Sequence, residues 1–299
     1  MDDGVPSDWT QWRTGAPIRW SNGDAGSGDL RNAARQFLRD AGDSPWVVVW
    51  CAGSGTTNSP LTKLQDEVMA LRSTLDELSR ATAGRRGMFF FASSAGGVYS
   101  GVGAPPYDEF SPVLPLTDYG RAKLEGEELV TEWSHRVGIP SLIGRIANLY
   151  GPGQDFNKPQ GLISQICRSY LLGTPVSIYV SLDTLRDYIF APDCASLIIE
   201  GLVRLAKEDL NADPLVVTKI FASQHAITIG AVLGELRRIL KSPPRIVVAT
   251  SEVSQTQVRD LSLRSVVWPE LDRRVNTPFP VGVAMTVSDL RRRLQAAEL

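Results

Sequence analysis

The chain has 299 residues, of which 43% are hydrophobic and 21% charged; this excludes a largely disordered protein and suffices for one large or two modest domains. With 31 basic and 33 acidic residues, the net charge of −2 predicts no general attraction to nucleic acid or to an anionic membrane. The sequence has no apolar run of membrane-spanning length and no signal-peptide pattern. Three cysteines and two histidines without metal-ligand spacing predict reduced thiols, no metal site and a cytoplasmic location.

The first half of the chain alternates apolar strand patterns with helical patterns, after an irregular lead-in over residues 1–15. Strands are predicted at 16–20, 46–51, 87–93 and 140–146, and helices at 30–40, 61–82 and 117–137. Apolar strands that alternate with helices predict an α/β fold, in which a doubly wound parallel sheet is covered on both faces. The loops beyond the carboxyl ends of such strands usually form the functional site.

The second half, after Gly151, has shorter strands and a different character. Helices are predicted at 161–172, 193–206, 228–240 and 287–297, and strands at 176–180, 216–222 and 245–250. Thr228 is expected to cap its helix. We expect two domains, residues 1–150 and residues 151–299, with late strands of the first sheet interleaved in the second domain.

Tyr119 and Lys123 are the most informative residues of the first half. They are four residues apart in a predicted helix and therefore lie one turn apart on the same face. A phenol has an unperturbed pKa of about 10, and a nearby ammonium group lowers this pKa, so the pair can transfer protons. A Tyr-x-x-x-Lys pattern alone is weak evidence, but here a buried strand ending in Ser93 and Ser94 precedes it. A hydroxyl at this strand end could bind the same substrate oxygen.

With these segments in order, the chain resembles the extended short-chain dehydrogenase/reductases, the NAD-dependent epimerase/dehydratase family that works mostly on nucleotide sugars. The matching segments are 47–53, 93–99, 119–127, 145–154 and 185–193, and the resemblance covers most of residues 16–245. It implies a Rossmann-like first domain, a smaller substrate domain, and NAD or NADP as the cofactor. It also implies a nucleotide-sugar substrate and a possible homodimer formed through helices such as the one carrying Tyr119.

The resemblance also implies roles for the residues of the catalytic segment. Tyr119 would be the general acid/base, and Lys123 would lower the pKa of this phenol and bind the nicotinamide ribose. Ser94 stands 25 residues before Tyr119, a spacing typical of the family, which makes it the catalytic hydroxyl with Ser93 as its alternate. Counting back from Val98 and Tyr99, which follow in the sequence, instead places Ala95 in the position of the catalytic hydroxyl. A structural alternative is that both hydroxyls only cap the strand end.

Further residues are implied for the cofactor and the substrate. By resemblance, the cofactor would contact Ala52 and Gly53 at the end of a strand, Ser93 and, near the adenine, Asp24. Asn148 would face the substrate diphosphate, and its alternative role is that of a turn-forming asparagine. Arg186 could clamp a phosphate as a fork of donors. Its alternative is an ion pair with the neighbouring acids Asp183 and Asp187.

The chain departs from the family at its beginning, where no Gly-x-x-Gly-x-x-Gly turn is present to hold the cofactor pyrophosphate. Residues 16–20 resemble the family's third strand, so the strands that precede it in the family leave a gap in the sheet. Three explanations are open. The sheet closes up with residues 16–20 in the central place, a partner chain fills the gap, or the sequence is a shortened form of a longer enzyme. A competing hypothesis is that residues 23–28 form a phosphate-binding turn, one residue short of the usual spacing. Weak cofactor binding would favour the alternative of a redox-inactive relative that binds a sugar nucleotide or a partner subunit.

Overall fold

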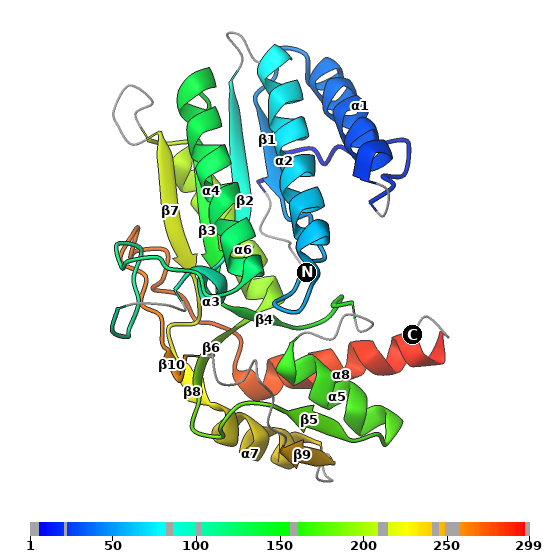
Figure 1. The fold of residues 1–299 in the computed structure, drawn as a ribbon, viewed down its shortest axis with the longest axis vertical. Coiled ribbons are helices and arrows are strands. Elements are labelled where there is room, and N and C mark those ends of the chain that lie inside the picture. The colour runs from blue at the N-terminus through cyan, green and yellow to red at the C-terminus, as the bar shows by residue number, and fades with distance from the viewer. Residues whose placement is uncertain are drawn as a thin grey trace. The chain divides into compact units, whose positions relative to one another are not determined.

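The computed structural model describes residues 6–20, 23–81, 86–99, 103–155, 161–208, 215–240, 245–248 and 258–296. The chain divides into two compact units between which it crosses several times (Figure 1). The first unit consists of Met1–Val98, Thr117–Arg145 and Ile198–Lys219, and the second unit of Tyr99–Leu116, Ile146–Leu197 and Ile220–Leu299. None of the helices in the described ranges is both long and apolar enough to cross a membrane.

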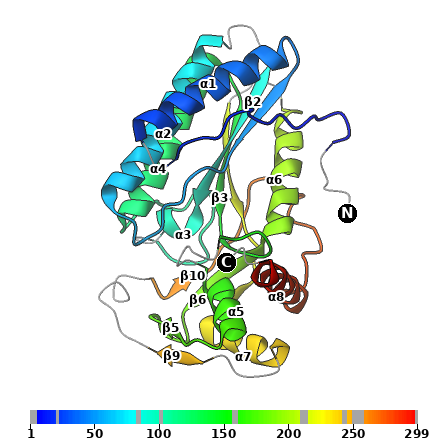
Figure 2. The ribbon, with the colours of Figure 1, turned by 90° about the vertical axis from the view of Figure 1, so that its right-hand side faces the viewer.

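The first unit is built on a four-stranded sheet with the order β1-β2-β3-β7. Its strands are β1 (Trp46–Trp50), β2 (Gly87–Ser94), β3 (Ser141–Ile146) and β7 (Val216–Phe221). β1 and β2 are parallel, with Trp46 opposite Gly87 and Trp50 opposite Phe91. Helices lie on both faces of this sheet, α1 (Gly23–Ala41), α2 (Leu61–Ala81) and α4 (Asp118–Val137) on one side and, on the other, the part of α6 (Ala191–Leu205) from Ile198 onward, which belongs to this unit (Figure 2). The predicted doubly wound α/β fold is therefore confirmed.

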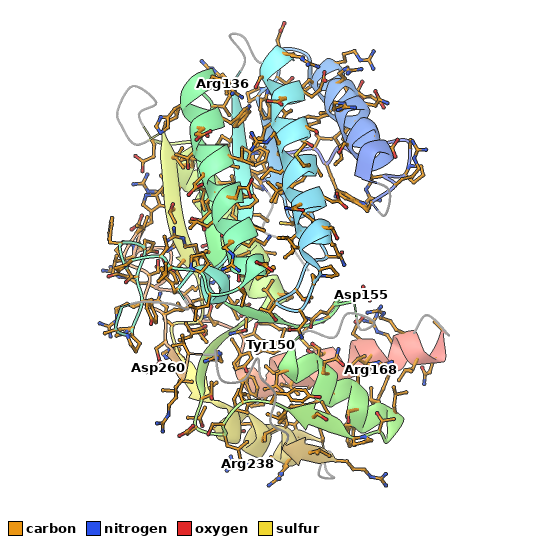
Figure 3. The ribbon with its side chains drawn as sticks, in the orientation of Figure 1. Arg136, Tyr150, Asp155, Arg168, Arg238 and Asp260 are labelled. Carbon is orange, nitrogen blue, oxygen red and sulfur yellow. The ribbon has the colours of Figure 1, made fainter. Side chains whose placement is uncertain are left out.

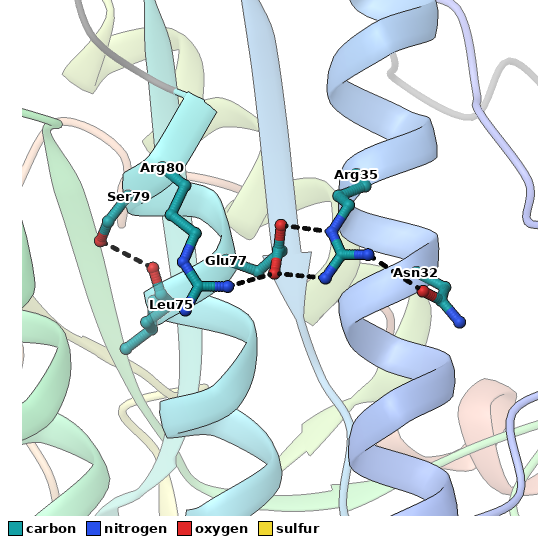
Figure 4. Close-up of polar contacts among 6 residues, drawn as sticks. All are labelled: Asn32, Arg35, Leu75, Glu77, Ser79 and Arg80. Carbon is teal, nitrogen blue, oxygen red and sulfur yellow. Dashed lines mark hydrogen bonds and ion pairs between the residues drawn. The ribbon is translucent and has the colours of Figure 1, made fainter.

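Apolar side chains from β1 and β2 and from α1, α2 and α4 form the core of the first unit. Phe89 and Trp133 are almost completely buried, and their ring centroids are 5.4 Å apart. A polar contact joins α1 to α2 beside this core (Figure 4). The buried carboxylate of Glu77 accepts hydrogen bonds of 2.7 and 3.1 Å from Arg35 on α1 and one of 3.1 Å from Arg80 on its own helix. Two guanidinium groups thus satisfy one buried charge, as buried ions require.

Within the described ranges, the second unit holds short strands and three complete helices. β6 (Leu185–Phe190) lies between β10 (Asp260–Leu261) and β4 (Asn148–Tyr150), and β8 (Ala226–Thr228) pairs with it antiparallel. β5 (Val176–Ile178) pairs with β9 (Ile246–Val248), and the helices are α5 (Leu162–Leu172), α7 (Ile229–Ile239) and α8 (Phe279–Gln295). Tyr150 (Figure 3) lies in the core, with its ring centroid 5.5 Å from that of Phe190 and 5.4 Å from that of Phe279. Thr228 caps α7 as predicted, since its hydroxyl accepts a bond of 3.1 Å from the Ala231 amide.

The predicted strand at residues 16–20 is wrong, because this segment forms no strand and packs beside α1. Arg19 binds Asp29 of α1 through both its backbone amide, at 3.0 Å, and its guanidinium group, at 2.8 Å. The ring of Trp20 contacts that of Trp50 with centroids 6.5 Å apart, and Pro17 has no amide hydrogen for a sheet. Because these local contacts hold the segment outside the sheet, the hypothesis that it takes the central position in the sheet is also wrong.

The hypothesis of a phosphate-binding turn at residues 23–28 is likewise wrong, because these residues form the first turns of α1. α1 begins at Gly23, seven residues earlier than predicted. Gly26 serves close packing here, because an ideal Cβ on it would lie 2.8 Å from the carbonyl oxygen of Arg19. α8 also begins earlier than predicted, at Phe279, and its second residue is Pro280, which is tolerated there because the first turn has no intrahelical partner for an amide hydrogen.

Candidate active site at the ends of β1 and β2

Helix α4 is placed against β2 by its caps and by one small residue. Thr117 starts the helix by accepting a hydrogen bond of 3.1 Å from the Gly120 amide, and Gly138 ends it with a φ of 70°. Near the middle, an ideal Cβ on Gly126 would lie 2.4 Å from the ring of Phe91 on β2. Only a residue without a side chain permits this approach, which brings the preceding turns of α4 over the end of β2.

Tyr119 and Lys123 lie in the pocket that this packing creates. The pocket, in the first unit, is lined among others by Trp50, Ala52, Glu67, Phe91, Tyr119 and Lys123. The Tyr119 phenol is hydrogen-bonded to the Ser94 hydroxyl. The Lys123 ammonium donates a bond of 3.0 Å to the Ala92 carbonyl and lies 5.8 Å from the centroid of the Tyr119 ring. The structure therefore brings together the three residues that the sequence predicted as catalytic.

Ser93 and Ser94 are placed in different surroundings, because adjacent residues of a strand point to opposite faces. The buried Ser93 hydroxyl donates a hydrogen bond of 2.5 Å to Glu127, which also pairs at 2.7 Å with the guanidinium group of Arg145. Ser94 instead accepts a bond of 3.2 Å from the Gly97 amide and contacts Tyr119. The geometry thus favours Ser94 over Ser93 as the hydroxyl of the site, and Ser93 belongs to a buried ionic cluster. Ala95, the candidate from counting back, is a buried residue of the short helix α3 (Ala95–Val98).

Burial has the largest influence on the protonation of this pair. It raises the pKa of the Tyr119 phenol, which is the direction opposite to that expected from the Tyr/Lys spacing. Burial also lowers the pKa of the Lys123 ammonium, while the carboxylates Glu67 and Glu127 and the thiolate form of Cys51 act to raise it. Without a ligand, the site therefore keeps the proton on the phenol.

Glu67 on α2 belongs to the site although no sequence pattern indicated it. Its carboxylate Oε1 accepts hydrogen bonds of 2.6 Å from the Ser54 amide and 2.7 Å from the Gly55 amide, in the loop that follows β1. Gly53, with a φ of +125°, lies so close that an ideal Cβ would come within 2.8 Å of Oε2. In the sequence, Glu67 is indistinguishable from the solvated polar residues of an amphipathic helix.

The remaining predicted cofactor and substrate residues are separately placed. Ala52 and Gly53 follow β1, where they were expected, whereas Asp24 is in the first turn of α1 and its side chain lies outside the described part of the chain. Asn148 begins β4 in the second unit and donates a bond of 2.9 Å to the Asp187 carbonyl. Arg186 lies on the adjacent strand β6, where Tyr188 is the residue opposite Asn148, and donates a bond of 2.7 Å to the carbonyl of Leu185.

The acids that were expected to pair with Arg186 have other partners. Asp183 forms an ion pair with Arg259, and buried Asp187 accepts bonds of 2.8 and 3.0 Å from the amide and hydroxyl of Ser223. Burial raises the pKa of Asp187 and lowers that of Arg186. Among the described residues, no group of three or more His, Cys, Asp or Glu side chains could hold a metal ion. Cys167 and Cys194 are buried thiols, whereas Cys51, directly after β1, is exposed.

Curated proteins similar to this chain are nucleotide-sugar enzymes by name. It is 35% identical to the putative UDP-glucose 4-epimerase of Methanocaldococcus jannaschii over 105 residues, which are 35% of this chain and 34% of that protein. It is 32% identical to the dTDP-4-dehydro-6-deoxyglucose reductase of Escherichia coli over 120 residues, 40% of this chain and 38% of that protein. The matched region thus spans only about a third of the length of these relatives.

Solved structures of low sequence identity share the fold over most of the chain. The Thermus thermophilus UDP-glucose 4-epimerase in complex with NAD matches with a TM-score of 0.73 at 19% identity, covering 94% of this chain and 86% of that one. MoeE5 in complex with UDP-glucuronic acid and NAD matches with a TM-score of 0.71 at 21% identity, covering 88% and 82%. The family model described as "NAD dependent epimerase/dehydratase family" matches residues 17–212. The chain is accordingly a member of the NAD-dependent epimerase/dehydratase family.

Proposed function

We propose that the protein is an NAD-linked epimerase, dehydratase or reductase that acts on a nucleotide sugar through Ser94, Tyr119 and Lys123. The observation that carries this proposal is the pocket in which the Tyr119 phenol is bonded to Ser94 and lies beside the Lys123 ammonium. Family membership and the names of the similar proteins support the reaction class.

The proposed roles follow from the contacts of each group. Tyr119 holds the proton that is exchanged with a sugar hydroxyl or carbonyl oxygen, and Ser94 hydrogen-bonds to the same oxygen and orients it. Lys123 supplies a positive charge close to the phenol and, with the ligand in place, favours its ionised form. When bound, NAD supplies the hydride chemistry that side chains lack.

The residues around the pocket fit the nicotinamide half of such a cofactor. Ala52 and the ammonium group of Lys123, which both line the pocket, would hold the ribose on this side together with Gly53. For the pyrophosphate, the described residues provide no counterpart at residues 23–28, which are helical. We therefore expect weaker cofactor affinity than a complete glycine turn gives, and the choice between NAD and NADP is left to measurement.

For the substrate, Asn148 and Arg186 are proposed as contacts of the diphosphate. The similar proteins named for UDP-glucose and dTDP-sugar chemistry support a nucleotide sugar as the substrate class. A cytoplasmic location fits the three thiols, and a homodimer is the proposed assembly.

Isothermal titration calorimetry with NAD, NADH, NADP and NADPH tests the proposal. The result expected is saturable binding that is lost in the double variant Tyr119→Phe, Lys123→Ala and kept in Lys63→Ala, a matched change at an exposed lysine of α2. Absence of binding up to about millimolar cofactor (a free energy near −4 kcal/mol) by a folded protein would contradict the proposal. It would then favour the redox-inactive alternative that binds a sugar nucleotide or a partner subunit.

A further inference from the structure

Glu67 joins two parts of the candidate site that are distant in sequence. Its part-buried carboxylate lies in the same pocket as Tyr119 and Lys123. One oxygen of this carboxylate accepts the amide hydrogens of Ser54 and Gly55 at 2.6 and 2.7 Å, and the other packs against the loop glycines. Short hydrogen bonds from two amides to a carboxylate are of the charge-assisted kind, which is about twice as strong as a neutral bond. Glu67 is therefore well suited to fix the loop after β1.

The same carboxylate differs in its electrostatic effect from the other acid near Lys123. Glu127, on α4, is paired with Arg145 of β3 at 2.7 Å, so that a buried cation offsets its charge. The partners of Glu67 are neutral amides, which stabilise the negative charge without cancelling it. The remaining titratable groups that act on Lys123 or share its pocket are Cys51 after β1 and Tyr119 on α4. Of these groups, Glu67 is the carboxylate whose full charge acts on both Tyr119 and Lys123.

We propose that Glu67 is a positioning residue of this site, whose carboxylate fixes residues 54 and 55 and places a negative charge in the pocket that holds Tyr119 and Lys123. The catalytic meaning of this inference rests on the proposed function. A pair that retains both protons is set to donate one to a carbonyl oxygen, whereas removal of a proton from a hydroxyl requires the phenolate. Glu67 would thereby keep the pair in the protonated form that is used when a carbonyl carbon takes a hydride from the reduced nicotinamide cofactor and its oxygen takes a proton from Tyr119.

The test uses three variants of the full chain without cofactor or substrate. Glu67→Gln removes the charge and retains an oxygen that can accept the two amide hydrogens, and Glu67→Ala removes both. Asp66→Asn is the matched control, because Asp66 is an exposed neighbour on the same helix. Nuclear magnetic resonance with isotope-labelled lysine follows the titration of Lys123, which is one of only six lysines and is assigned through Lys123→Arg. Amide hydrogen exchange of Ser54 and Gly55 reports on the loop.

The expected results separate charge from positioning. Lys123 should lose its proton at lower pH in both Glu67→Gln and Glu67→Ala, and at the wild-type pH in Asp66→Asn. Exchange of the two amides should accelerate about tenfold or more in Glu67→Ala and stay near the wild-type rate in Glu67→Gln. A merely structural role would not displace the Lys123 titration in the glutamine variant, so an unchanged titration there overturns the proposal.

A further variant covers the case in which Glu67→Gln does not fold. Glu67→Asp keeps the charge and shortens the side chain, so it should speed amide exchange while Lys123 titrates close to the wild-type pH. A large downward displacement in this variant would overturn the proposal. All these readouts are taken on the ligand-free protein, so they remain decisive even where the calorimetry shows no cofactor binding.

Discussion

The buried cluster of Ser93, Glu127 and Arg145 gives the strongest prediction of the structure. The side chains of Arg145 and Glu127 are only 9% and 6% exposed. Glu127 accepts bonds of 2.7, 3.1 and 3.2 Å from the guanidinium group and one of 2.5 Å from the Ser93 hydroxyl. Glu127→Gln removes the negative charge and leaves the arginine buried with a neutral amide. We expect the variant to fold with a markedly lower free energy of unfolding.

The magnitude follows from the burial of both partners. Breaking a buried ion pair by removing one partner destabilises a protein by about 3–5 kcal/mol, because the remaining charge stays desolvated. Since glutamine retains one acceptor oxygen, we expect a loss of about 3 kcal/mol. At a urea m-value of about 3 kcal/mol/M, this loss lowers the unfolding midpoint by about 1 M.

Urea unfolding followed by tryptophan fluorescence is a suitable assay, because six of the seven tryptophans belong to the first unit. Replacing Trp268 by Phe in all variants confines the signal to this unit. The matched control is Asp76→Asn, which removes the carboxylate of an exposed pair with Arg136 (labelled in Figure 3) at 3.6 Å. Side chains that are 60% and 57% exposed gain little from pairing, so the control should lose no more than about 1 kcal/mol. Equal losses in the two variants would refute the argument from burial.

Three further predictions concern β2 and α4. Ser94→Ala should lower turnover about a hundredfold with little change in the urea midpoint. Ser93→Ala should lower turnover less than Ser94→Ala does, and should destabilise the fold by about 1–2 kcal/mol. The opposite pattern of effects would show that Ser93 is the site hydroxyl. Gly126→Ala should destabilise by about 1–3 kcal/mol, since its Cβ would meet the Phe91 ring at 2.4 Å, and an unchanged midpoint would mean that this contact relaxes freely. Burial raises the pKa of Tyr119 above its ordinary 10.0, so the folded protein holds this proton to higher pH than the unfolded chain. The resulting stabilisation is complete below pH 10 and is lost as the pH rises through the folded-state pKa. In urea titrations at alkaline pH, wild type should therefore lose stability relative to Tyr119→Phe. Free energies of unfolding that change in parallel with pH in the two proteins would contradict this.

The long elements of the fold could be predicted because their apolar patterns are strong and local. The predictions at 46–51, 87–93 and 140–146 correspond to β1, β2 and β3, and those at 61–82 and 117–137 to α2 and α4. Four of the strands in the described ranges were missed. β6 was missed because Arg186 and Asp187 interrupt its apolar pattern, and β4, β8 and β10, with two or three residues each, because so few residues show no periodicity. Residues 16–20 have a strand-like composition, but contacts with α1 and β1, which no local pattern encodes, determine their conformation.

The candidate site was predictable to the extent that it depends on spacing along one element. Tyr119 and Lys123 could be paired because a helix repeats every 3.6 residues. The choice between Ser93 and Ser94 depends on which face of β2 meets the first turn of α4, and counting residues gives conflicting answers. Glu67 could not be found at all, since its contacts with the loop after β1 arise only from the packing of α2.

The electrostatics of the site divide the acids near Lys123 into two kinds. Glu127 lies close to the ammonium, but Arg145 and Ser93 satisfy its charge, and it therefore stabilises the fold more than it influences the proton on Lys123. Glu67 is held by amides alone and raises the pKa of both members of the pair, while burial shifts the two groups in opposite directions. For Tyr119 the two influences add, and for Lys123 they oppose each other. The phenol is consequently the group whose proton is most firmly held before any ligand binds. A reaction that begins with proton removal from a sugar therefore requires the charge of Lys123 to outweigh burial and Glu67 once the ligand is in place.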